Sequence, residues 1–167
     1  FFSSAVLLVE GPSEIILYKK VAKAKGIDLD KLNISILMVD GIDFEVYVKI
    51  LEALKIPWIL RTDNDIFKIP KKNAFRFAGI ERAINIYENY ISASNIIILQ
   101  NKNNLRWENK EEPNKINITS AKIIVKEIEK NGIFLSQKDL EYDLLNSSLK
   151  SEIKKYWDSD DEEEIIR

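Results

Sequence analysis

The first 65 residues alternate between short apolar runs and segments with helical spacing, which limits the possible folds more than any other feature. The runs at 6–9, 34–39 and 58–60 are almost continuously apolar and rich in β-branched side chains, as strands covered on both faces are. Apolar residues recur at helical spacing over 14–25 and 44–54. This order predicts a parallel sheet with right-handed crossovers. We therefore predict an α/β fold: a small, Rossmann-like parallel sheet flanked by helices on both faces.

Capping residues indicate where several helices begin and end. Ser13 is the expected N-cap of the first helix, and Gly26 is its expected C-terminal stop. Thr119 and Ser120 are expected to cap a later helix that runs through Lys130.

The middle of the chain gives weaker signals. Residues 68–76 form a basic stretch that we interpret as a loop, and 78–91 has helical spacing. The apolar run 96–99 fits either a strand or a buried turn of helix, and 101–117 is polar and is expected to be irregular. We interpret about 68–118 as a helical insertion into the sheet domain.

The C-terminal part is expected to complete one domain and then to change character. A short strand is predicted at 133–135 and a final helix over 140–157. Residues 1–157 are long enough for a single domain with a real core. Residues 158–167 hold six acids and one arginine, so 1–157 alone carries 24 basic and 21 acidic residues. We predict a mildly basic domain followed by a flexible acidic segment.

Histidine and cysteine are both absent from the sequence. Nucleophilic machinery of the Ser-His-Asp or Cys-His type is therefore excluded within this chain, and so is a zinc site of the usual kind. Hydrolytic chemistry would have to use carboxylates, which favour Mg²⁺ or Mn²⁺. A chain without cysteine fits a reducing cytoplasm, and no apolar run approaches the roughly 20 residues that span a membrane.

Acidic pairs follow three of the predicted strands. In open parallel sheets, ligands bind outside the carboxyl ends of the strands. If the first, third and last strands are neighbours, these carboxylates meet at one edge and repel one another unless a cation is present. One or two divalent ions would remove that conflict. The candidate ligands are Glu10 and Glu14, Asp63 and Asp65, and Asp139 and Glu141.

Basic residues directly after the Asp-x-Asp pair are candidates for holding DNA through its phosphates. Arginine and lysine bind phosphates without reading sequence. The candidates are Lys68, Lys71, Lys72 and Arg76.

Two motifs resemble the Toprim domain of topoisomerases, bacterial primases and several nucleases: a strand ending in Glu10-Gly11 and a later strand ending in Asp63-Asn64-Asp65. The nuclease version found in the OLD (overcoming lysogenization defect) family, including Gabija anti-phage nucleases, is more similar still. That resemblance is dense over about 5–65, including Leu7 to Glu14, and looser over 119–145.

The resemblance implies a metal-dependent endonuclease that normally follows an ABC-type ATPase domain and acts in phage defence. Glu10, Asp63 and Asp65 would be catalytic and hold one ion, with Glu10 as an alternative general base. The second ion would be held or shared by Glu14, Asp139 and Glu141, and Ca²⁺ would bind without supporting cleavage. The family's assisting lysine is expected among Lys150, Lys154 and Lys155 or past Arg167. A homodimer is left open.

Other classes of function remain open from the sequence. One is a non-catalytic module that binds metal or DNA for a partner ATPase domain. Another is a different Toprim activity, of topoisomerase or primase type. A haloacid dehalogenase phosphatase also uses Asp-x-Asp, but needs it after the first strand, where this chain carries Glu10.

Overall fold

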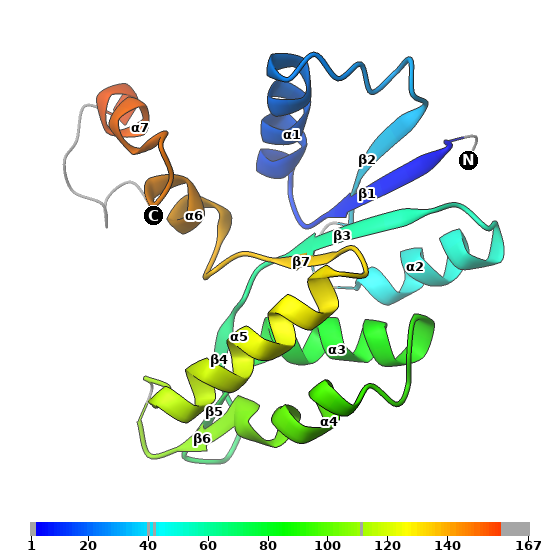
Figure 1. The fold of residues 1–167 in the computed structure, drawn as a ribbon. Helices are drawn as coiled ribbons and strands as arrows, with labels where there is room; N and C mark the ends of the chain where they lie inside the picture. The colour runs from blue at the N-terminus through cyan, green and yellow to red at the C-terminus, as the bar shows by residue number, and fades with distance from the viewer. Residues whose placement is uncertain (1–2, 40, 42, 111, 158–167) are drawn as a thin grey trace.

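A four-stranded parallel sheet lies at the centre of the molecule (Figure 1). The computed structural model describes residues 3–39, 41, 43–110 and 112–157. The strand order is β2-β1-β3-β7, and β1 pairs in parallel with both β2 and β3. This confirms the predicted parallel sheet. The strands β1, β3 and β7, which come first, third and last along the chain in this sheet, lie side by side. Their bounds are β1 Ala5–Val9, β2 Ile34–Met38, β3 Trp58–Thr62 and β7 Ile133–Leu135.

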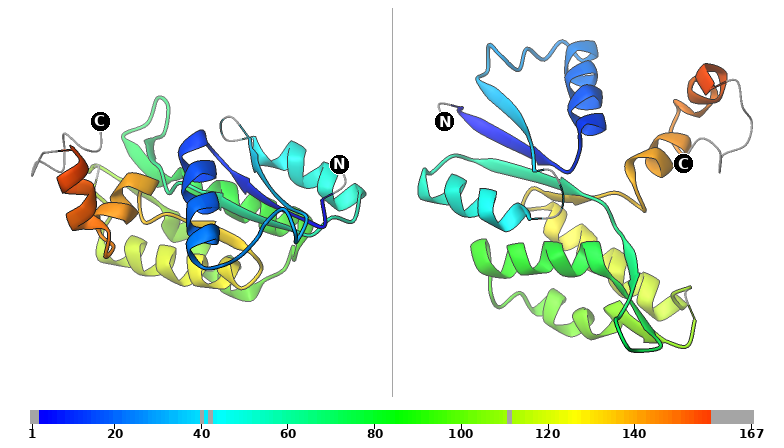
Figure 2. Two further views of the ribbon diagram at one scale, coloured as in Figure 1. Left: turned by 90° about the horizontal axis from the view of Figure 1, so that it is seen from above. Right: turned by 180° about the vertical axis from the view of Figure 1, so that it is seen from behind.

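Helices cover both faces of this sheet, as predicted (Figures 1 and 2). Successive side chains of a strand point to opposite faces. Leu8, Leu60 and Ile133 share one face through the strand register, and each is 0% exposed. That face forms the main core. The helix on the other face is α1 Pro12–Ala24, and those on the core face are α2 Phe44–Ala53, α3 Ala78–Tyr90 and α5 Lys115–Glu129.

Two of the predicted helix starts are wrong. Helix α1 begins at Pro12 with Gly11 as its N-cap, so Ser13 lies inside the first turn. Proline is favoured there because the first helical N–H needs no partner. The expected stop at Gly26 is confirmed, with φ +71° directly after the C-cap.

Helix α5 begins four residues before the predicted cap at Thr119. Its N-cap is Asn114, whose side chain accepts hydrogen bonds from the backbone N–H groups of Ile116 and Asn117. Asparagine satisfies these otherwise unpaired donors as well as a hydroxyl residue does. Thr119 and Ser120 therefore lie within the helix.

The segment between β3 and β7 contains a second sheet as well as helices. The basic loop predicted over 68–76 is confined to 69–73, because β4 Ile66–Lys68 and β5 Ala74–Phe77 form an antiparallel hairpin that β6 Arg106–Glu108 extends. The helix expected over 78–91 is confirmed as α3. The ambiguous apolar run belongs to a helix, α4 Ile96–Asn101. The segment expected to be irregular holds the 3-10 helix η1 Lys102–Leu105, β6 and the start of α5.

The predicted final helix is two helices, α6 Leu140–Leu145 and α7 Lys150–Trp157. Between them the Ser147 hydroxyl donates to the carbonyl of Leu144 and accepts from the N–H of Leu149. Such local side-chain bonds compete with helical pairing, which explains the break. The acidic segment 158–167 lies outside the described residues. None of the helices in the described part is long and apolar enough to cross a membrane.

Candidate metal centre

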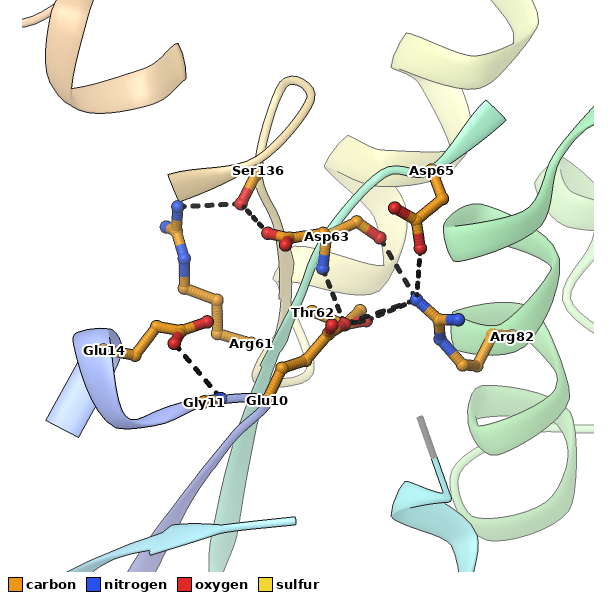
Figure 3. Close-up of polar contacts among 9 residues, drawn as sticks. All are labelled: Glu10, Gly11, Glu14, Arg61, Thr62, Asp63, Asp65, Arg82 and Ser136. Carbon is orange, nitrogen blue, oxygen red and sulfur yellow. Dashed lines mark hydrogen bonds and ion pairs between the residues drawn. The ribbon is translucent and has the colours of Figure 1, made fainter. Parts of the chain in front are cut away.

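Four of the six candidate carboxylates lie where β1 and β3 end (Figure 3). Glu10 follows β1 directly, and Glu14 lies in the first turn of α1. Asp63 and Asp65 follow β3, which pairs directly with β1. The adjacency of β1 and β3 therefore brings together residues that are more than 50 positions apart in the chain.

One carboxylate oxygen of Glu10 is held by three donors from other parts of the chain. Glu10 Oε1 accepts from the backbone N–H of Asp63 at 2.9 Å and from Nη2 of Arg82 at 3.3 Å. It also accepts a short hydrogen bond from the Thr62 hydroxyl. The side chain of Glu10 is thereby fixed against the end of β3.

The other three acids are likewise each held by one oxygen. Asp63 Oδ1 accepts from the Ser136 hydroxyl at 2.8 Å, and Asp65 Oδ2 pairs with Nη2 of Arg82 at 3.3 Å. Glu14 Oε2 accepts from the backbone N–H of Gly11 at 3.2 Å. The second oxygen of each acid has no hydrogen-bond or ion-pair partner among the described residues. These are Glu10 Oε2, Glu14 Oε1, Asp63 Oδ2 and Asp65 Oδ1.

This donor set fits a hard divalent cation. Mg²⁺ and Mn²⁺ prefer carboxylate oxygens, and the four remaining oxygens are of that type. Among the described residues, no three acids are close enough to hold one ion as their side chains stand. The four carboxylates nevertheless interact electrostatically, as the pKa of Asp63 shows. Rotation of these side chains can bring their oxygens together without moving the strands that carry them.

Burial raises the pKa of the Asp63 carboxyl from its ordinary value of 3.8 to about 6. The hydrogen bond from Ser136 opposes that rise, and the nearby carboxylates of Glu10, Glu14 and Asp65 add to it. A cation bound here would favour the ionised form and remove the repulsion. The acids therefore form an electrostatically unfavourable group that a cation would relieve.

Arg82 is the charged residue that sequence reasoning missed. It lies on α3, its side chain is 12% exposed, and it forms ion pairs with both Glu10 and Asp65. The N-terminus of α3 approaches the Asp-x-Asp segment closely: the N–H of Ala78 donates to the carbonyl of Asp65 at 2.7 Å. A Cβ on Gly79 would lie 2.0 Å from the carbonyl oxygen of Asp63. A glycine inside a helix, where it is normally unfavourable, was the available signal of this close approach.

The strand β7 contributes a hydroxyl rather than a carboxylate to this group. Ser136 directly follows β7 and bonds to Asp63, whereas Asp139 caps α6 by accepting from the backbone N–H of Tyr142 at 2.7 Å. Among the described residues, no hydrogen bond joins Asp139 or Glu141 to the four acids at β1 and β3, although the N–H of Asn64 donates to the carbonyl of Lys138 at 2.9 Å. Their part as ligands stays a prediction.

A second ion pair fixes the segment that follows β7. Arg61 on β3 donates to Asp143 at 2.8 Å and to the Ser136 hydroxyl at 3.0 Å. Asp143 also accepts from the backbone N–H of Gln137. Ser136 is thus positioned by Arg61 and in turn positions Asp63. Sequence reasoning missed this chain of contacts, because the residues lie more than 70 positions apart.

The predicted basic patch lies on the β4–β5 hairpin. Lys68, Lys71 and Lys72 are exposed. Arg76 pairs in register with Phe67, and Lys68 pairs with Phe75. Because alternate residues of a strand face opposite sides, Lys68 and Arg76 point to different faces of the hairpin.

A four-stranded parallel sheet with Glu-Gly after β1 and Asp-x-Asp after its neighbour β3 defines a Toprim-type fold. Residues 1–65 match the family described as the overcoming lysogenization defect protein-like TOPRIM domain. Residues 1–65 are thus similar to the Toprim domain of the OLD family.

Similar proteins extend the likeness beyond these 65 residues. Endonuclease GajA of Bacillus cereus strain VD045 is 33% identical over 163 residues, covering 96% of this chain and 28% of the relative. The C-terminal region of the Burkholderia pseudomallei OLD protein superposes with a TM-score of 0.68 at 24% identity, covering 93% of this chain and 65% of that one. The corresponding region from Xanthomonas campestris pv. campestris gives 0.62 at 27%, covering 93% and 62%. The chain therefore spans little more than a quarter of the GajA relative.

Proposed function

We propose that this chain is the metal-dependent DNA endonuclease part of a longer OLD-family protein. The observation that carries the proposal is the group of four carboxylates at the ends of β1 and β3, each held by one oxygen with the other left without a described partner. The likeness to an endonuclease over 96% of the chain supports it. The residues we propose to be catalytic are Glu10, Asp63 and Asp65.

Under this proposal the chain's own residues hold and orient the reacting groups. Glu10, Asp63 and Asp65 would hold one Mg²⁺ or Mn²⁺, with Glu14 at a second position that Asp139 and Glu141 complete. Divalent ions so held supply positive charge at a phosphodiester and make a bound water more acidic. Ca²⁺ is proposed to occupy the same ligands without supporting cleavage.

DNA is proposed to lie along the hairpin that follows the Asp-x-Asp segment. The strand β4 begins at Ile66, directly after Asp65, so this hairpin is covalently continuous with the acids. Lys68, Lys71 and Lys72 would neutralise phosphates on one side of the duplex. Arg76 forms an ion pair with Glu81 at 3.0 Å and would contribute from the opposite face of the hairpin.

The remaining context of the protein is also part of the proposal. An ABC-type ATPase domain in the same polypeptide and a role in phage defence are what the family resemblance implies. A cytoplasmic location is proposed because the chain lacks cysteine, and a homodimer is left open. Lys150, Lys154 and Lys155 lie on α7, which Figure 1 places beyond α6 at the outside of the molecule. For one of these three to be the assisting lysine, α7 would have to approach the acids when DNA is bound.

Nicking of supercoiled plasmid in Mn²⁺ or Mg²⁺ tests the proposal. We expect cleavage by the chain, loss of cleavage in Glu10→Gln and Asp63→Asn, and unchanged cleavage in Asp30→Asn, which removes an exposed acid distant from the site. Plasmid binding without nicking would instead favour the alternative, a non-catalytic module that serves a partner ATPase domain. Relaxation with religation would favour a topoisomerase-like activity, and template-dependent nucleotide incorporation a primase-like one.

A further inference from the structure

Arg82 contacts oxygen atoms from both strand ends with a single nitrogen (Figure 3). Its Nη2 lies 2.9 Å from the Thr62 hydroxyl and 3.4 Å from the Asp63 carbonyl. The same atom lies 3.3 Å from Glu10 Oε1 and 3.3 Å from Asp65 Oδ2. One guanidinium nitrogen thus joins the end of β1 to the Asp-x-Asp segment after β3.

The contacts of Arg82 select particular oxygens of the two acids. Glu10 Oε1 is shared among Arg82, Thr62 and the N–H of Asp63, and Asp65 Oδ2 is taken by Arg82. The opposite oxygens, Glu10 Oε2 and Asp65 Oδ1, have no partner among the described residues. A carboxylate held in this way can turn only one oxygen toward a ligand.

The position of Arg82 is itself fixed by the fold. Its side chain is 12% exposed, and α3 is held against the Asp-x-Asp segment by the hydrogen bond from Ala78 to the carbonyl of Asp65. Gly79 permits that approach because a side chain there would overlap the Asp63 carbonyl. The packing of α3 thus fixes the backbone of Arg82, and burial and the oxygen contacts of Nη2 restrain its guanidinium.

We propose that Arg82 is a positioning residue that presents one oxygen each of Glu10 and Asp65 to a divalent ion. The inference rests on the proposed function, since it assumes that these acids are ligands. Two effects of the guanidinium oppose each other. Its charge repels a cation, but Glu10 and Asp65 already neutralise that charge. Its hydrogen bonds orient two ligands, and loss of such outer partners typically lowers metal affinity about 10–100-fold. Four neighbouring carboxylates exceed the single charge of Arg82, so the group still attracts a cation and we expect the loss of orientation to be the larger effect.

The test is the Mn²⁺ affinity of the purified chain, measured by electron paramagnetic resonance of the free ion. We expect Arg82→Gln to weaken Mn²⁺ binding at least about tenfold. Arg82→Lys keeps the charge on a shorter side chain and is expected to bind with an affinity between those of the wild type and R82Q. Arg106→Gln is the matched control, because it removes an exposed ion pair with Glu81 on the same helix α3.

The outcomes separate this inference from the proposed function. Mn²⁺ binding by R82Q as tight as that of the wild type, or tighter, overturns the positioning role and leaves the metal site standing. Absence of Mn²⁺ binding by the wild type overturns the proposed function and the inference with it. If R82Q does not fold, as judged by circular dichroism, R82K decides: weaker binding supports the role, and wild-type affinity rejects it.

Discussion

Asp63 is expected to destabilise the metal-free protein at neutral pH, and its removal should make the fold more stable. Its pKa rises from 3.8 to about 6 on folding, mainly through burial. The folded state therefore binds more protons than the unfolded state between these values, so stability falls as the pH rises through about 6. The difference corresponds to about 3 kcal/mol, and partial exposure of the carboxylate reduces our expectation to about 1–3 kcal/mol.

The perturbation is Asp63→Asn, which keeps an oxygen that can accept from the Ser136 hydroxyl. Urea unfolding with EDTA at pH 7.5 should show D63N more stable than the wild type by about 1–3 kcal/mol. Below about pH 3 the two should be equally stable, since Asp63 is then protonated in both the folded and the unfolded state. Asp30→Asn, at an exposed position, should change little at either pH.

Added divalent ion should reduce the stability advantage of D63N over the wild type. Binding to the folded state alone stabilises it by about 2.7 kcal/mol when the ion is present at a hundred times its dissociation constant. The wild type should gain this stability with Mn²⁺, and D63N should gain less. Our reasoning is refuted if D63N is no more stable than D30N at pH 7.5 without metal, or if its advantage persists unchanged at pH 3.

Two further changes test the hairpin and the approach of α3. Reversing Lys71 and Lys72 to glutamate should weaken DNA binding and reduce the slope of log affinity against log salt by about 2, measured by fluorescence anisotropy. An equal loss of binding in the control pair Lys23→Glu and Lys25→Glu would show that net charge matters and not the hairpin. Gly79→Ala should destabilise the fold in urea, because the added Cβ meets a carbonyl oxygen at 2.0 Å, whereas at an ordinary helical position it stabilises by about 0.5–1 kcal/mol. A stabilised G79A would contradict the close approach.

The sequence predicted the elements whose signals are local and periodic. The strands at β1, β2, β3 and β7 were predicted from apolar runs. Their order in the sheet was left conditional, and the pairing of β1 with β3 is what brings Glu10 beside Asp63 and Asp65. The β4–β5 hairpin was missed because Pro70 and three lysines interrupt the alternation that marks a strand. The short strand β6, with only three residues, offers too little pattern to identify.

The site residues that were missed depend on tertiary contacts. Arg82 follows Glu81 in an amphipathic helix, and such a pair of charges usually lies on a solvated surface. In the fold both are largely covered: Arg82 reaches the acids at the end of β3, and Glu81 pairs with Arg76 and Arg106 of the second sheet. Ser136 carries no sequence signal at all, because a serine after a strand is a common turn residue.

The distribution of these residues along the chain bears on what constitutes the site. The family match covers 1–65 and includes Glu10, Glu14, Asp63 and Asp65. Arg82 from α3 bonds to the side chains of Glu10 and Asp65, and Ser136 after β7 bonds to that of Asp63. Both residues lie beyond that match. Segment 66–136 therefore does more than connect two strands, because its first helix and its last residue fix the carboxylates. A chain cut after residue 65 would keep all four acids at β1 and β3 but lose the side-chain hydrogen bonds of Asp63 and Asp65 and one of the three that hold Glu10.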